Sequence, residues 1–91
     1  MKEAKIKWSE YMLYRLKARG FDSTKIEDIV RHSPERYTDS ESSRTVVIGK
    51  HDEMLVMVPI EFDDSEIQPI TVHATSRQQV NFRLRSGRFQ L

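Results

Sequence analysis

Residues 44–62 read RTVVIGKHDEMLVMVPIEF, and this stretch decides the fold class. Residues 44–49 are rich in β-branched side chains and residues 54–62 form an apolar run, as expected of two strands. The polar KHDE segment between them is a turn, and so short a connection joins antiparallel strands. Pro59 has no backbone N–H to donate, so we expect the second strand to lie at a sheet edge there or to bend. The stretch therefore predicts a β-hairpin.

A third strand and a helix follow the hairpin. The DDSE turn signal precedes residues 67–73, IQPITVH, which we predict to be the third strand. From residue 76 to residue 86 the period becomes helical. Thr75 and Gln78 have the spacing of a capping box, and Gly87 is a natural end for the helix. The C-terminal part is therefore predicted as strand, cap and helix.

Two amphipathic helices are predicted before the hairpin. Apolar side chains in residues 9–19 recur at helical spacing, and Gly20 is a natural C-terminal cap. Asp22 is a candidate N-cap for the next helix, which Pro34 ends. The order of elements predicts an α+β fold in one domain, residues 1–91, with two N-terminal helices, a three- to four-stranded antiparallel sheet and a C-terminal helix.

The composition narrows the class of protein. The chain has 91 residues, of which 37% are hydrophobic and 32% charged, which fits a small globular domain. We expect no membrane span and no secretory signal, because no sufficiently long apolar run is present, and hence a cytoplasmic protein. With no cysteine, and with three histidines that lack metal-ligand spacing, we expect neither a metal nor a cofactor.

The small net charge of +1 conceals a division of charge along the chain. Residues 1–20 contain six Lys or Arg and two Asp or Glu, residues 21–70 contain five and twelve, and residues 71–91 contain four and none. This basic, acidic, basic order suggests one surface for a polyanion and another for a basic partner. The alternative is that folding mixes the three blocks over the surface.

The basic C-terminal block, HATSRQQVNFRLRSGRF at residues 73–89, holds the candidate site. On a helix, Arg77, Asn81 and Arg85 would fall within about 80° of one another, a basic stripe beside the apolar Val80 and Leu84. Arginine suits phosphate because its planar guanidinium donates two hydrogen bonds at once and stays charged. The stripe therefore predicts contact with a nucleic-acid backbone.

His73 stands where the third strand ends, and an imidazole can transfer protons near neutral pH. Together with nearby guanidinium groups it suggests metal-independent RNA cleavage. In this hypothesis His73 transfers protons and Arg77 and Arg85 bind the scissile phosphate. The side chains that would position the RNA backbone are Asn81, Arg83 and Arg88. The alternatives are a structural His73 and a helix face that is only solvated.

The chain resembles small bacterial domains of the RelE/ParE/BrnT toxin superfamily over nearly its whole length. The resemblance rests on RLKARGFDSTKIEDIV, RTVVIG, MLVMVPI and ITVHATSR. The matching positions are Arg15, Arg19, Gly20, Phe21, Ile26, Ile29, Gly49 and residues 74–77. It implies a compact antiparallel sheet with two N-terminal helices, and Arg77 matches the basic positions that relatives place near the scissile phosphate. Phe89 stands near the place where RelE-type toxins often have a catalytic tyrosine or histidine.

This resemblance implies the toxin half of a toxin–antitoxin pair. Its partners would be RNA, including ribosome-bound messenger RNA, and a cognate antitoxin, and cleavage would need no metal. ParE-like relatives act on DNA gyrase instead, so a toxin without nuclease activity is a further possibility. The alternative from another class is a non-catalytic module that binds nucleic acid or protein through the same basic C-terminal face. The sequence leaves the oligomeric state open.

Overall fold

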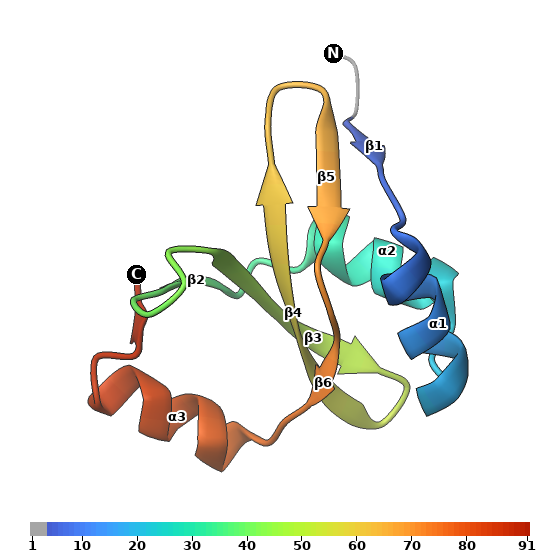
Figure 1. The fold of residues 1–91 in the computed structure, drawn as a ribbon. Helices are drawn as coiled ribbons and strands as arrows, with labels where there is room; N and C mark the ends of the chain where they lie inside the picture. The colour runs from blue at the N-terminus through green and yellow to red at the C-terminus, as the bar shows by residue number, and fades with distance from the viewer. Residues whose placement is uncertain (1–3) are drawn as a thin grey trace.

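The computed structural model describes residues 4–91 and has an α+β fold (Figure 1). Residues 1–3, which the predicted domain and the N-terminal basic block include, lie outside the described residues. Three helices and seven strands are found in residues 4–91. In chain order they are β1 (Lys5–Ile6), α1 (Glu10–Arg19), α2 (Ser23–His32), β2 (Arg36–Asp39), β3 (Thr45–His51), β4 (Met54–Phe62), β5 (Glu66–Pro69), β6 (His73–Ala74), α3 (Arg77–Arg85) and β7 (Phe89–Gln90).

The central hairpin is confirmed. Strands β3 and β4 pair antiparallel along their whole length, from Thr45 opposite Ile60 to His51 opposite Met54. The turn between them has two residues, and the first, Asp52, has a left-handed φ of 56°. Aspartate tolerates this conformation better than most residues. The turn is therefore shorter than predicted, because His51 pairs with β4, but it lies within the predicted segment.

The rest of the sheet differs from the prediction of three or four antiparallel strands. The sheet is mixed, with the order β1-β5-β4-β3-β2-β7, and β6 pairs with β4 beside this path. Strand β1 runs parallel to β5, whereas the other pairs are antiparallel. The unpredicted strands β1, β2 and β7 have two to four residues each. Segments so short have no alternating pattern of their own, and they become strands by pairing with the hairpin or its neighbours.

The predicted third strand, residues 67–73, is two strands separated by a gap. Strand β5 ends at Pro69 and β6 begins at His73, and both pair with β4. In the gap the backbone N–H of Ile70 donates to the carbonyl of Pro59, 2.8 Å away. A strand residue directs its N–H and C=O to the same side, so the nitrogen of Pro59 also faces this gap. Pro59 therefore lies in a central strand, where the interrupted ladder accommodates its missing donor.

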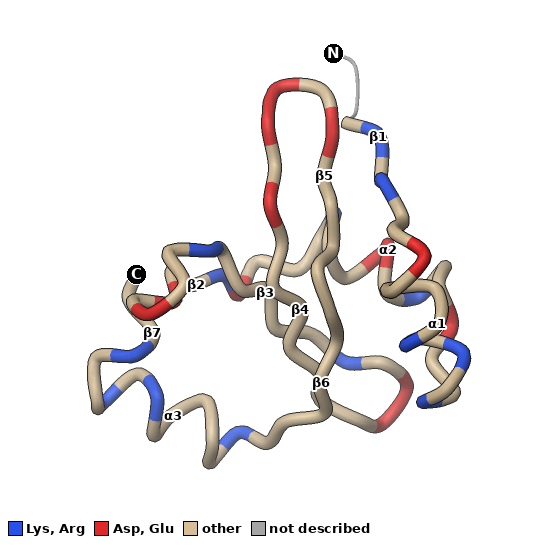
Figure 2. Tube along the Cα trace, in the orientation of Figure 1, with Lys and Arg blue, Asp and Glu red and all other residues tan. Residues whose placement is uncertain are grey.

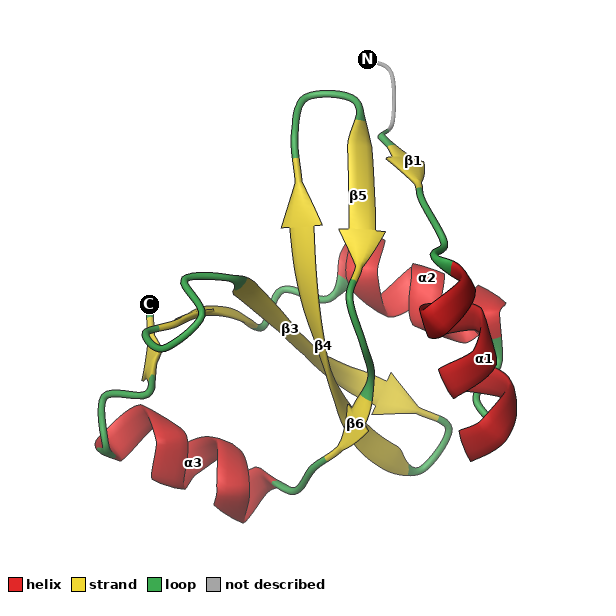
Figure 3. Cartoon of the chain, in the orientation of Figure 1, coloured by secondary structure: helices red, strands yellow, loops and turns green. Residues whose placement is uncertain are grey.

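Helices cover both faces of the sheet (Figure 3). On β3, Val47 packs with α1 and α2, whereas Val46 and Ile48 pack with α3. The first core consists of Met12, Leu16, Ile26, Ile29, Val30, Val47, Val56, Val58, Ile60 and Val72. The second core is smaller and consists of Val46, Ile48, Val80 and Phe89. Because the second core has so few buried side chains, α3 needs further contacts to stay packed on the sheet.

The helix ends follow the predicted capping residues with one exception. Gly20 ends α1 in the left-handed conformation, and the Asp22 carboxylate caps α2. For α3 the predicted capping box of Thr75 and Gln78 is wrong by one residue. The N-cap is Ser76, whose Oγ accepts a hydrogen bond from the backbone N–H of Gln79, 3.1 Å away. The backbone N–H of Thr75 donates to the carbonyl of Leu55 on β4, 2.9 Å away, so Thr75 still belongs to the sheet side of the connection.

Candidate nucleic-acid interface

Two arginines at the two ends of α3 hold the helix to β2. Nη1 and Nη2 of Arg77 lie 2.5 and 2.9 Å from the two carboxylate oxygens of Glu35. Past the other end, Nε of Arg88 lies 2.7 Å from Oδ1 of Asp39, and its Nη1 lies 2.9 Å from Oε2 of Glu41. Such bidentate pairs combine charge with fixed geometry. Arg77 and Arg88 therefore anchor the helix, and their charges are matched within the protein.

These ion pairs lower the pKa values of the carboxyl groups that accept the hydrogen bonds. The guanidinium of Arg77 holds the pKa of Glu35 below its usual value, and the hydroxyl of Tyr37 adds a hydrogen bond of 2.6 Å. Arg88 lowers the pKa of Asp39 in the same way. Both carboxylates therefore stay ionised at neutral pH, and the two pairs stay intact.

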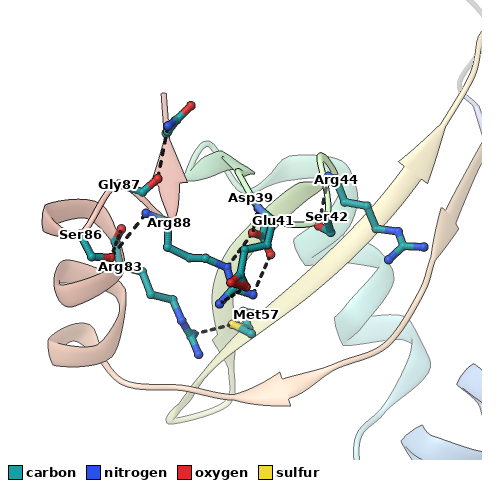
Figure 4. A network of polar contacts seen from close by, with 10 residues as sticks. Asp39, Glu41, Ser42, Arg44, Met57, Arg83, Ser86, Gly87 and Arg88 are labelled. Atoms are coloured by element: carbon teal, nitrogen blue, oxygen red, sulfur yellow. Dashed lines mark hydrogen bonds and ion pairs between the residues drawn. The ribbon is translucent and has the colours of Figure 1, made fainter.

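Arg83, between these two anchors, points under the helix toward β4 (Figure 4). Its Nη1 lies 3.1 Å from the sulfur of Met57, and its guanidinium lies 5.6 Å from the centre of the Phe89 ring. Phe89 is 2% exposed and stacks on Tyr37 at 5.6 Å. The aromatic residue near the expected catalytic position is thus part of the core.

His73 lies on β6, opposite Met57 of β4. Its Nδ1 lies 3.2 Å from Nη2 of Arg15, which reaches it from α1. Arg15 also donates to the hydroxyl of Tyr11 and to the carbonyl of Val72, at 3.1 and 3.5 Å. His73 is therefore held at the sheet edge between α1 and α3.

This contact fixes the protonation of the imidazole. A guanidinium can only donate, so Nδ1 of His73 accepts from Arg15 and the ring proton lies on Nε2. Partial burial lowers the pKa of His73, and the positive charges of Arg15, Arg19 and Arg83 lower it further. We call Arg15, Arg19, His73 and Arg83 the His73 cluster. It is a neutral imidazole among three cations.

The structure separates the six residues of the predicted site. His73 and Arg83 lie near one another, whereas Arg77 and Arg88 are in ion pairs with acids on or beside β2. Arg85 and Asn81 are exposed on α3. Val80 is buried and Leu84 packs beside it, so the apolar side of the predicted stripe is confirmed.

Arg15 and Arg19 were not among the predicted site residues, although both lie in the RLKARG motif. They are 58 and 54 positions before His73 in the chain, on a helix that packs on the other face of the sheet. Their spacing of four places both on one side of α1. The sequence alone does not indicate that this side of α1 lies near His73, because only the folded path of β6 past α1 brings them together.

A groove of about 790 Å³ lies at the C-terminal half of α3. One wall is the helix, with Gln78, Gln79, Phe82, Arg83 and Arg85, and the other includes Ser40 and Glu41 after β2. Figure 4 shows Arg88 directed from the end of the helix toward Asp39 and Glu41. Arg88 is shared by Asp39 and Glu41 and offsets one of their two negative charges, so the basic helix wall of the groove faces a wall that keeps some acidic character.

The arginines fall into two classes by their partners. Among the described residues, no carboxylate pairs with Arg15, Arg19, Arg83 or Arg85, whereas Arg44 and Arg77 each pair with one carboxylate and Arg88 pairs with two. Figure 2 shows the basic residues of α1 and α3 on either side of β6, and acidic residues at the tip of the β4–β5 hairpin. The unpaired guanidiniums therefore gather away from the acidic tip.

Comparison of the chain with protein-family models, with curated proteins and with solved structures finds no match. Within residues 4–91, no three His, Asp or Glu side chains come together as ligands for a metal ion. None of the helices in that range combines the length and the apolar character that crossing a membrane requires. The interpretation of the site therefore rests on its own geometry and charge.

Proposed function

We propose that the protein binds RNA through the His73 cluster and the adjacent Arg85. The observation that carries the proposal is that Nη2 of Arg15 lies 3.2 Å from Nδ1 of His73, while Arg83 reaches from α3 to Met57, which lies opposite His73 on β4. Neither arginine has a carboxylate partner in the described part of the chain, and the positive charge of Arg19 also lowers the pKa of His73. Like charges held together are unfavourable unless an anion joins them. A phosphate would offset their repulsion.

The chemistry of the cluster suits a phosphate backbone. Arginine donates two parallel hydrogen bonds to phosphate oxygens. With Nδ1 held by Arg15, His73 presents the N–H of Nε2, a further donor. The groups come from α1, β6 and α3, so successive phosphates of one strand could each meet a different element.

The test is the salt dependence of RNA binding. Fluorescence anisotropy with a short labelled oligouridylate should give an affinity that falls linearly with salt concentration on a double-logarithmic plot. The reason is that each phosphate contact releases condensed counterions. For Arg83→Gln we expect a slope smaller by about 0.7 and an affinity about eightfold lower near 50 mM salt.

The matched control is Arg44→Gln, which removes the same charge from an exposed pair with Glu61 on the β3–β4 hairpin. This control should leave the slope unchanged. Equal losses in both variants would mean that net charge alone drives binding. No salt-dependent binding by the wild-type protein would overturn the proposal.

Cleavage of messenger RNA by a toxin is the second candidate, supported by the resemblance to the RelE/ParE/BrnT superfamily and by an imidazole among guanidiniums. A general base needs a free lone pair near the proton it removes. In His73 the unprotonated nitrogen accepts from Arg15, and Nε2 carries a proton. This arrangement favours binding over cleavage, unless Arg15 releases Nδ1.

Incubation of the protein with labelled messenger RNA, with and without ribosomes, separates the two candidates. A nuclease would produce fragments, and His73→Ala should slow their formation at least tenfold, given the usual contribution of general acid–base catalysis. Intact RNA in the presence of saturating wild-type protein would exclude the nuclease and leave the binding module.

A further inference from the structure

The exposed aromatic ring of Phe82 is unexplained by the fold. Its side chain is 62% exposed on α3, a helix that buries Val80 and packs Leu84 against the sheet. Its neighbours one turn away are Gln78 and Ser86, and it lies within the groove described above. Single exposed apolar side chains are common on protein surfaces, and it is the place of this ring in a groove beside two arginines that points to a ligand.

The groove around Phe82 joins the His73 cluster. Arg83 belongs to both, because it lines the groove and its Nη1 lies 3.1 Å from the sulfur of Met57, which is opposite His73 in the sheet. Arg85 lies on the same helix wall and has no carboxylate partner in residues 4–91. A strand whose phosphates meet the cluster can therefore continue along α3 past the aromatic ring.

We propose that the Phe82 groove binds an unpaired nucleotide of single-stranded RNA, whose base stacks on the ring of Phe82. Gln78 and Gln79 present side-chain amides beside the ring, and amides can bond to the edges of a base. Arg83 and Arg85 supply positive charge for the flanking phosphates. This inference rests on the proposed function and specifies the class of RNA.

The surroundings of Phe82 favour a single strand over other occupants. In a duplex the faces of the bases are stacked on one another and unavailable to a side chain, whereas single strands offer them freely. An apolar protein segment would cover the ring but would also bury the side chains of Gln78 and Arg85 without partners, which is unfavourable. A nucleotide satisfies both the ring and the polar groups.

The experiment compares two probes of equal length and charge, a labelled oligouridylate and its abasic counterpart, in fluorescence anisotropy. We expect wild-type protein to bind oligouridylate more tightly than the abasic strand. Phe82→Ala should lower the affinity for oligouridylate about tenfold and leave abasic binding unchanged. The salt slope should stay the same, because no charge is removed.

Phe82→Trp and Phe82→Leu are the matched variants. Tryptophan keeps an aromatic face and should retain the affinity, whereas leucine keeps apolar area without a ring and should behave like alanine. Thermal unfolding followed by circular dichroism should show the same midpoint for all three, because the side chain is exposed.

Equal binding of both probes by the wild-type protein would overturn base stacking while leaving phosphate binding intact. Unchanged oligouridylate affinity in Phe82→Ala would have the same meaning, and would point to a protein partner for the ring. Binding of neither probe by the wild-type protein would overturn the proposed function together with this inference.

Discussion

The two sides of α3 both carry arginines, but the arginines of each side have opposite surroundings. Toward β2, Arg77 and Arg88 each meet carboxylates, and the pairs fasten the helix. Toward β6, Arg83 meets a thioether, an aromatic ring and the field of Arg15 and Arg19. Arginine content alone therefore does not identify a binding surface, and the proposed RNA surface rests instead on arginines that lack a carboxylate partner in the described residues.

The effects on pKa express the same contrast. The arginines on the β2 side lower the pKa of Glu35 and Asp39, which favours the ionised acid and stabilises the fold. On the β6 side, the arginines add to the effect of burial on His73 and lower its pKa, which keeps the imidazole neutral. The arginines of the β2 side are paired with acids, whereas under the proposed function the β6 side would gain stability on binding an anion.

The largest expected effect comes from removing the α1 arginines of the unpaired side. The double variant Arg15→Gln and Arg19→Gln should lower RNA affinity roughly sixty-fold near 50 mM salt, and the salt slope should fall by about 1.4, because two phosphate contacts are lost. Anisotropy with labelled oligouridylate across a salt series measures both quantities.

The control for this variant takes the same charge from paired residues. Lys25→Gln with Arg44→Gln breaks the pairs with Asp52 and Glu61, which lie on the central hairpin and its turn. We expect at most a small change in affinity from this double variant. If it weakens binding as strongly as the loss of Arg15 and Arg19, the two classes of basic residue are equivalent and the comparison fails.

The central part of the fold could be predicted from the sequence because its signals are local. The hairpin follows from its β-branched and apolar runs, and Gly20 and Asp22 mark helix ends by their own conformational preferences. Strands β2 and β7 could not be found in this way. Two to four residues show no period, and they become strands through pairs such as Asp39 with Phe89.

The same distinction between local and long-range signals applies to the candidate site. The apolar side of α3 was predictable from the spacing of Val80 and Leu84, because helical geometry is local. Which arginines are free was not predictable, because Glu35 and Asp39 lie 42 and 49 positions from their partners in the chain. Ion pairs across such separations depend on the tertiary fold, and the sequence shows only that acids and bases are both present.

A smaller effect is expected from breaking the paired side. Asp39 is 8% exposed, and it accepts from Arg88 and from the backbone N–H of Glu41. Asp39→Ala should lower the free energy of unfolding by about 1–2 kcal/mol, a range that allows for the solvent around Arg88. Urea denaturation measures the change, and RNA affinity should not fall.

Glu61→Ala is the comparison for this variant, because Glu61 pairs with Arg44 in an exposed position. Its loss should change the free energy of unfolding by less than about 0.5 kcal/mol. If Asp39→Ala is no more destabilising than Glu61→Ala, the ion pairs beside β2 do not hold α3, and the two sides of the helix differ less than the structure implies.

The smallest expected effect is on the pH dependence of stability, through His73, which is partly buried among cations. Because burial and the neighbouring arginines hold the pKa of His73 in the folded protein below the ordinary value of about 6.5, the unfolded chain binds the proton first as the pH falls. Stability is therefore complete above pH about 6.5 and declines below it, with a slope that one proton limits to about 1.4 kcal/mol per pH unit.

His73→Asn keeps an acceptor for Arg15 without titrating, so the decline in urea stability should be shallower in the variant. His32 and His51 are the same in both proteins, so the difference between the two curves reports on His73. Added oligouridylate should reduce the decline in the wild-type protein, since a bound phosphate favours the protonated imidazole. Parallel curves for the two proteins would mean that neither burial nor the arginines around His73 lower its pKa, and the unpaired side would then have no charge to be offset.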